Sequence, residues 1–89
     1  MNEITTVWKY QLQVTDLQKV PMPEGAILLS AQMQDGLLCL WALVNPNAKK
    51  TVRTIEIIGT GNPSEPKLRR YVSTVQQAGG APRHVFERL

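Results

Sequence analysis

The sequence has few of the residues from which catalytic and metal sites are built. Its 89 residues include one cysteine, Cys39, and one histidine, His84. One cysteine excludes an internal disulfide, while metal sites and acid–base triads need several convergent groups. The seven acidic residues are spread singly, so no paired-carboxylate pattern appears. We therefore expect no catalytic residues, no metal and no cofactor, with Cys39 a small buried apolar residue and His84 structural.

Long apolar runs and targeting segments are also lacking. The longest strongly apolar stretch, LLCLWALV at 37–44, is far shorter than the roughly 20 residues that cross a bilayer. The first residues, MNEITTVWKYQLQV, contain no basic region followed by an apolar run, so no signal peptide is predicted. We expect no membrane association, and a lone cysteine fits a reducing compartment.

Size and composition indicate one globular domain over residues 1–89. Hydrophobic residues make up 43% and charged residues 19% of the chain, which is ordinary for a folded domain. A domain this small has a thin core, so a partner chain, most simply a second copy in a dimer, would help to complete it. The net charge of +3 permits weak attraction to nucleic acid, phosphates or acidic protein surfaces without indicating any of them.

A period of two residues dominates the chain and predicts strands. In VWKYQLQV, 7–14, Trp8 and Tyr10 share one face with the later apolar residues, while the polar residues share the other. Further strands are predicted at 51–59 and 69–77, and residues 83–89 are expected to form a short strand or a frayed end. Residues 15–26 are expected to form a loop with a short edge strand around 17–20, because Pro21 and Pro23 exclude the middle of a sheet.

A β-hairpin is predicted around Asp35-Gly36, a pair that tolerates the positive φ angles of a type I′ turn. This turn pairs Gln34 with Leu37 and fixes the register of both strands. The pairs that follow are Ala31 with Leu40, Leu29 with Ala42, and Ile27 with Val44, all on one apolar face. The second strand, 37–44, is apolar on both sides, so the hairpin is expected at the centre of a sheet or in an oligomer interface.

The opposite face of this hairpin is a candidate interface. Glutamine side chains hydrogen-bond without carrying charge, and such a face suits a wet protein–protein contact, a polar ligand groove or plain solvent exposure. The candidate interface residues are Gln32, Gln34, Cys39, Trp41 and Leu43. The predicted fold class is all-β and mainly antiparallel, with about six short strands in a small sheet, sandwich or partly open barrel. At most one short helical turn is expected, over 65–70 with Ser64 as its cap.

The Gly59-Thr60-Gly61 segment invites comparison with phosphate-binding loops. Such loops need a helix N-terminus after the glycines, whereas here prolines follow, so a plain strand end is the simpler interpretation. A small anion could still be held without a helix. The candidate anion-binding residues are Thr60, Asn62, Lys67, Arg69 and Arg70. The basic KLRR stretch beside Tyr71 also permits single-stranded nucleic acid or a nucleotide as a partner, or forms a solvated basic loop.

Nearly the whole chain, roughly 7–88, resembles a family of short phage and prophage proteins that has no assigned function. The residues that carry the resemblance are Trp8-Lys9-Tyr10, Thr15-Asp16, Met22-Pro23, Gly25-Ala26, Leu40-Trp41-Ala42, Gly59-Thr60-Gly61, Pro63 and His84-Val85-Phe86-Glu87. The chain departs from that pattern at Asn62 and Arg83, where relatives often carry histidine and an aromatic residue. A paired-histidine site, if relatives use one, is therefore half lost here.

The resemblance implies phage origin and a host bacterial cytoplasm, but no reaction. Small phage proteins of this kind are often accessory factors, and some block host defence. The leading hypothesis is a non-enzymatic protein, in a homo-oligomer, that binds a host bacterial protein complex such as a CRISPR system and inhibits it. The alternative is a small-ligand, nucleotide or nucleic-acid binding module built on the Gly-Thr-Gly-Asn loop and its basic neighbours.

Overall fold

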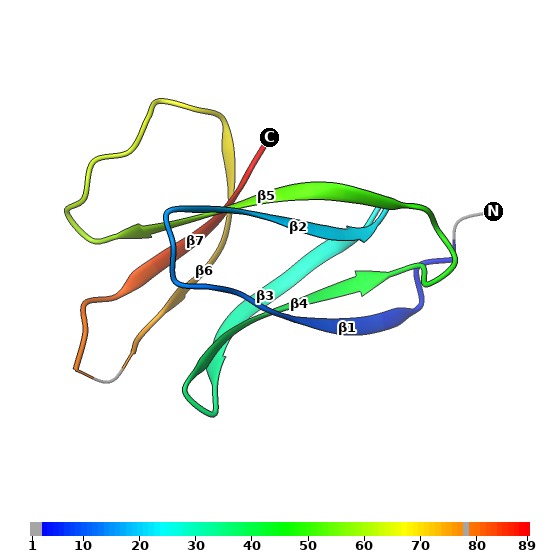
Figure 1. Ribbon diagram of the computed structural model, residues 1–89, viewed down its shortest axis with the longest axis horizontal. Coiled ribbons are helices and arrows are strands. Elements are labelled where there is room, and N and C mark those ends of the chain that lie inside the picture. The colour runs from blue at the N-terminus through cyan, green and yellow to red at the C-terminus, as the bar shows by residue number, and fades with distance from the viewer. Residues whose placement is uncertain (1–2, 78) are drawn as a thin grey trace.

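The computed structural model describes residues 3–77 and 79–89, which form seven strands and no helix. The predicted all-β, antiparallel class is confirmed, with one strand more than expected. No described segment is a helix long and apolar enough to cross a membrane. The strands shown in Figure 1 are β1 (Thr6–Gln11), β2 (Leu17–Pro23), β3 (Ile27–Gln34), β4 (Leu37–Val44), β5 (Lys50–Gly59), β6 (Arg69–Val75) and β7 (Arg83–Arg88).

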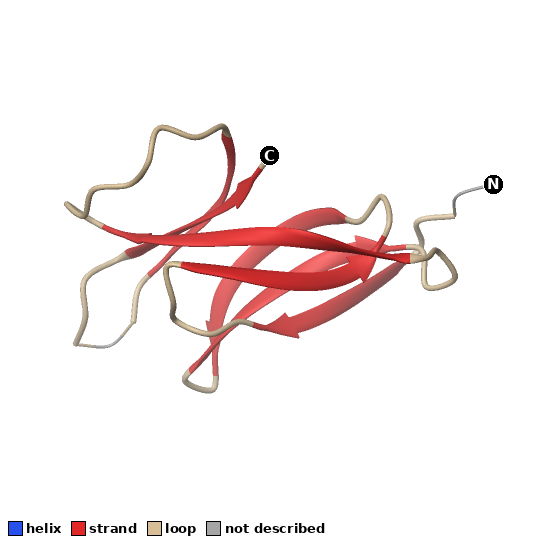
Figure 2. Cartoon of the chain, turned by 45° about the horizontal axis from the view of Figure 1, so that its top comes forward, coloured by secondary structure: helices blue, strands red, loops and turns tan. Residues whose placement is uncertain are grey.

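The strands make two antiparallel sheets that enclose the core. Sheet A has the order β1-β4-β3, and sheet B has the order β2-β5-β7-β6. Figure 2 shows them as two layers. Leu40 of sheet A and Met22, Ile55 and Val85 of sheet B are completely buried between them. The apolar strand 37–44 becomes β4, the central strand of sheet A, as the sequence predicts.

The two sheets meet along one side only. There β3 and β6 lie side by side, and the backbone N–H of Ala31 donates to the Ser73 hydroxyl at 2.8 Å. The hydroxyls of Ser30 and Ser73 lie 3.3 Å apart. On the other side β1 and β2 do not pair, so the seven strands do not close into a barrel.

The hairpin turn forms as predicted. Asp35 and Gly36 have φ angles of 52° and 78°, the positive values that a type I′ turn requires. Gln34 lies opposite Leu37 and Ala31 lies opposite Leu40, so the predicted register holds next to the turn.

Further from the turn the predicted register is wrong, because a β-bulge interrupts β3 between Leu28 and Ser30. A bulge adds one residue to a strand, and the two-residue period of side chains then reverses which residues face inward. Leu28, not Leu29, lies opposite Ala42, and Ile27 lies opposite Leu43. Leu29 and Ile27, both predicted to be in the core, are 48% and 50% exposed.

Strand β2 is an edge strand, longer than the one predicted, and it accommodates its prolines without losing hydrogen bonds. The backbone N–H of Ile57 donates to the Asp16 carbonyl at 3.0 Å, which sets the alternation of bonded and free residues along β2. By that alternation Pro21 and Pro23 stand where a backbone N–H would point away from β5. Proline is thus found here only where the sheet needs no donor.

The predicted helical turn over 65–70 is wrong. Residues 62–68 form an irregular loop, and β6 already begins at Arg69. The Leu68 carbonyl accepts a bond from the Leu89 N–H at 3.1 Å, which draws the chain alongside β7 and overrides the weak capping signal of Ser64. Strands β1 and β6 also end before the predicted limits of residues 14 and 77.

Candidate functional site

The outer face of sheet A is the side turned away from the core, and it is unusually apolar for a surface. Val7 of β1, Ile27 of β3 and Leu37 of β4 are 53%, 50% and 47% exposed. Between them Trp41 and Leu43 are only partly buried. The register places Val7, Leu43 and Ile27 in one row across the three strands. Val7, Leu43 and Ile27 are therefore contiguous on a face that the two-layer fold leaves uncovered, while Leu37 lies on the same face at the other end of β4.

The predicted interface residues lie on this outer face, with different exposures. Gln32 and Gln34 are exposed, while Trp41 and Leu43 are partly buried. Cys39 is only 2% exposed, although its side chain belongs to the same face. The ammonium group of Lys9 on β1 donates to Oε1 of Gln34 on β3 at 2.7 Å, so this bridge crosses β4 in the region of Cys39. The thiol is thus shielded and offers little contact area.

Three outer-face residues were not selected from the sequence. Val7 shares the two-residue period of Lys9 and Gln11, and this period was the signal that could have placed it on the outer face. Leu37 follows the turn in the same phase as Cys39 and Trp41. Nothing in the sequence pattern marks Ile27 as outward-facing, because the alternation of apolar and polar residues does not reveal the bulge that turns it outward.

The Gly-Thr-Gly segment forms a tight turn at the end of β5. The Asn62 N–H donates to the Gly59 carbonyl at 3.0 Å, and Gly61 has a φ of +85°. The Asn62 amide packs directly on Gly59, where an added Cβ would lie 2.8 Å from Nδ2. Gly61 therefore has a structural reason in its positive φ, and the interpretation as a strand end is supported.

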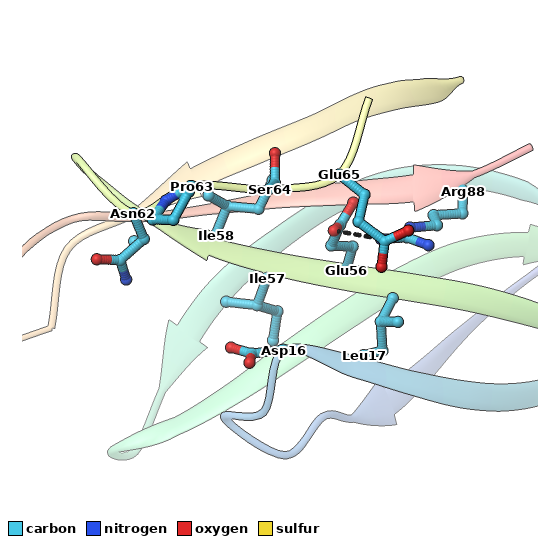
Figure 3. Close-up of a pocket in the computed structure, with 11 residues that line it drawn as sticks. Asp16, Leu17, Glu56, Ile57, Ile58, Asn62, Pro63, Ser64, Glu65 and Arg88 are labelled. Carbon is cyan, nitrogen blue, oxygen red and sulfur yellow. Dashed lines mark hydrogen bonds and ion pairs between the residues drawn. The ribbon is translucent and has the colours of Figure 1, made fainter. Parts of the chain in front are cut away.

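Beyond this turn the loop arches over β5 and encloses a cavity of about 440 Å³ (Figure 3). The charged residues that line it are Asp16, Glu56, Glu65 and Arg88. Three carboxylates thus face one guanidinium, and that guanidinium is already bonded to Glu56. Such a lining gives an anion little attraction.

Glu56 is the best-connected group at this cavity. Its side chain is 6% exposed and accepts bonds from Arg69 Nε at 2.8 Å and Arg88 Nη2 at 2.9 Å. The hydrogen bond from Arg88, assisted by the one from Arg69, lowers the pKa of Glu56 below its ordinary value against the opposing effect of burial. The charged form is therefore the one that the folded state stabilises.

This shift predicts a loss of stability in acid. Because folding lowers the pKa of Glu56, its contribution is complete above the unfolded pKa of about 4.3 and is lost as the pH falls through the folded value. We expect the free energy of unfolding to fall below about pH 5. The Glu56→Gln variant should be less stable at neutral pH and show a flatter profile. Urea titrations from neutral pH into acid test this, with exposed Glu65→Gln as the control; an equally steep profile for Glu56→Gln contradicts it.

The structure does not bring the predicted anion-binding residues together. Arg69 bonds to Glu56 on the outer face of sheet B, and its Nη2 also donates to the Glu65 carbonyl at 2.6 Å. Arg70 points to the opposite face of the sheet, 4.0 Å from Glu87. Lys67 is exposed and lies 4.0 Å from Glu65. The cations are thus divided between two faces and are near carboxylates.

Thr60 instead belongs to a chain of hydrogen bonds through His84 that sequence reasoning did not find. Tyr71 Oη lies 2.7 Å from Thr74 Oγ1, which lies 3.0 Å from His84 Nδ1. His84 Nε2 lies 2.8 Å from Thr60 Oγ1, which in turn is 3.5 Å from the Pro82 carbonyl oxygen. If each hydroxyl donates to the next group, the ring carries its proton on Nε2. This chain of hydrogen bonds ties β6, β7 and the turn after β5 together, and no carboxylate in the described part of the protein bonds to the ring.

A second ion cluster lies on the core side of sheet B. Glu87, whose side chain is 5% exposed, accepts bonds from Arg53 through Nε and, at 3.0 Å, through Nη2. Arg53 Nη1 also donates to the Ala26 carbonyl at 2.9 Å. This arginine therefore links β5 and β7 to the segment that enters β3.

Comparison with known proteins gives a family and no activity. A family profile described as a domain of unknown function (DUF7352) matches residues 3–89. No curated protein and no solved structure matches the chain. In the described residues no three histidine, cysteine, aspartate or glutamate side chains are grouped to hold a metal ion.

Proposed function

We infer that this chain, which belongs to the DUF7352 family of unknown function, is a non-enzymatic binding protein that contacts its partner through the outer face of sheet A. One observation carries the proposal: Val7, Ile27 and Leu37 are each about half-exposed on the same face of sheet A, and Val7 and Ile27 flank Leu43 in one apolar row. Contiguous apolar patches on small proteins mark interaction sites more often than isolated apolar residues do.

The composition of this face suits a protein partner. Trp41 lies at its centre, and tryptophan is enriched among the residues that dominate binding energy. The exposed amides of Gln11 and Gln32 flank Cys39, and that of Gln34 lies opposite Leu37, so they can form hydrogen bonds in a wet contact beside the apolar residues. Lys9, the one cation on this face among the described residues, is already bonded to Gln34, so charge steering is weak.

The biological setting we propose follows the resemblance to short phage proteins. In that setting the protein is a phage accessory factor in the host bacterial cytoplasm. Its partner is a host protein complex of a defence system such as CRISPR, and binding inhibits that system by occupying one of its surfaces. The support for this step is the sequence likeness together with a fold that offers a binding face.

The test compares two matched surface variants in bacteria that carry active CRISPR immunity against a phage. Wild-type protein should raise the plating efficiency of that phage. Leu37→Lys, on the outer face of sheet A, should abolish the effect, whereas Tyr71→Lys, at a residue 57% exposed on sheet B, should keep it. A photocrosslinker at residue 37 should capture one protein of the defence complex, and the same probe at residue 71 should not.

Two outcomes overturn the proposal. If wild-type protein leaves plating unchanged against every defence system tried, the inhibitor assignment fails. If the Tyr71 variant loses activity and the Leu37 variant keeps it, the face is wrong. Co-purification of nucleic acid that salt releases would instead support the alternative of a nucleic-acid module, since phosphate-driven binding weakens as salt rises. That alternative is less favoured, because Arg69 and Arg88 are occupied by Glu56.

A further inference from the structure

The two sheets have four edges, and three of them are protected. The edges β3 and β6 cover each other through the contacts of Ser73. The edge of β2 carries Pro21 and Pro23 at positions that face outward, and prolines there block the addition of a strand. Strand β1 has neither a proline nor a bulge, and within residues 3–77 and 79–89 no other strand pairs with its outer side.

The free backbone groups of β1 can be identified from its register. The Leu12 N–H donates to the Leu38 carbonyl at 2.8 Å, so residues 12 and 38 form a hydrogen-bonded pair. Bonded and free residues alternate along an antiparallel strand, so Trp8 and Tyr10 bond to β4. The N–H and C=O groups of Val7, Lys9 and Gln11 therefore point away from the sheet.

Gln13 is the next residue after Gln11 whose backbone groups point away from β4, and its bonds show how this edge can be satisfied. The side-chain amide of Gln18 bonds to both backbone groups of Gln13: the Gln13 N–H donates to Oε1 at 3.0 Å, and Nε2 donates to the Gln13 carbonyl at 2.6 Å. This pair of bonds imitates a neighbouring strand. These bonds satisfy the backbone groups of Gln13. The edge that stays open consists of the outward-facing backbone groups of Val7, Lys9 and Gln11.

Space remains beside the end of this open edge. A cavity of about 380 Å³ lies between the ends of β1 and β2, with Gln11 on one side and Lys19 and Pro21 on the other. The Tyr10 hydroxyl, whose residue also lines the cavity, is buried without a hydrogen-bond partner among the described residues. Burial raises the pKa of this hydroxyl above its ordinary value. Strands β1 and β2 belong to different sheets and do not pair with each other.

We propose that the open edge of β1 pairs with the same edge of a second copy, antiparallel about Lys9, to make a six-stranded sheet from two sheets A. In this register each Trp8 lies opposite Tyr10 of the second copy at a non-hydrogen-bonded position, where cross-strand side chains come closest. The repulsion between the two Lys9 side chains is reduced, because each ammonium group is drawn across its own sheet to Gln34. The contact is isologous, as a two-fold dimer requires.

The pairing is self-complementary and leaves the outer face of sheet A free, so the dimer does not depend on the proposed function. An experiment can therefore contradict binding through the outer face of sheet A without contradicting the dimer through β1, and the reverse. A strand donated by another protein is the competing occupant, and it would leave the isolated protein monomeric.

Proline at Lys9 is the sharpest test, because it blocks the free edge while removing no bond to β4. Light scattering after size exclusion should give twice the chain mass of 10.0 kDa for wild type and the single mass for Lys9→Pro. Lys19→Pro, the matched change on the outward row of β2, and Lys9→Ala should both remain dimers. Leu37→Lys should also remain a dimer, although it abolishes binding through the face.

Amide hydrogen exchange on wild-type protein keeps the test valid if Lys9→Pro fails to fold. The N–H groups of Val7, Lys9 and Gln11 should exchange slowly at high protein concentration and quickly after dilution to the monomer. A monomeric wild type, a Lys9→Pro dimer, or rapid exchange of these three amides at every concentration overturns the proposal. Loss of the dimer in Leu37→Lys alone would place the interface on the sheet face instead.

Discussion

Replacing Glu87 by alanine should lower the free energy of unfolding by up to about 3–5 kcal/mol, because it leaves the partly buried charge of Arg53 without its carboxylate partner. Glu87 is the acceptor for two nitrogens of Arg53, and its side chain is 5% exposed. With the carboxylate gone, Arg53 keeps only its bond to the Ala26 carbonyl. Its charge would then face the core between the sheets.

The size of the effect comes from desolvation and not from the attraction of the pair itself. Removing both charges should therefore cost less than removing one. We expect the double variant Arg53→Met/Glu87→Leu to recover much of the stability that Glu87→Ala loses. Such recovery would also show that the cluster is not what makes the fold stable.

Urea unfolding followed by circular dichroism measures these differences. Glu65→Ala is the control, because Glu65 is exposed and lies 4.0 Å from Lys67, a surface pair worth at most about 1 kcal/mol. Equal losses for Glu65→Ala and Glu87→Ala would mean that the Arg53–Glu87 contact is not buried in solution.

The sequence alone predicts those parts of the fold that depend on neighbours in the chain. Alternation places Trp8 and Tyr10 inward on β1, and Asp35-Gly36 fixes the hairpin turn. Contacts between distant segments leave no such pattern. The bulge before Ser30 and the bond from Ala31 to Ser73 both occur where β3 meets β6, and that neighbour is 42 residues away in the chain.

The candidate sites show the same division between local and distant information. Trp41 and Leu43 are on the outer face of sheet A because β4 alternates regularly. The cations after the Gly-Thr-Gly turn looked available because nothing in the sequence shows that Arg69 reaches back to Glu56 on β5. The segment that looks basic in the sequence therefore has its cations near carboxylates in the fold. The glycines before it form the turn at the end of β5.

Truncating Leu40 to alanine is the second large effect, with an expected loss of about 2–5 kcal/mol. Leu40 is completely buried at the centre of sheet A, where removing the side chain leaves a cavity that the two sheets cannot close. Leu29→Ala in the same hairpin removes the same atoms from a residue that is 48% exposed, and should cost well under half as much.

The comparison of these two leucines tests the bulge directly. Unbroken alternation would put both in the core and make the two substitutions similarly costly. Thermal or urea unfolding of the two variants therefore distinguishes the registers: a large gap requires the bulge between Leu28 and Ser30, and equal losses contradict it. The proposed binding face depends on the same result, because only the bulged register turns Ile27 outward beside Leu43 and Val7.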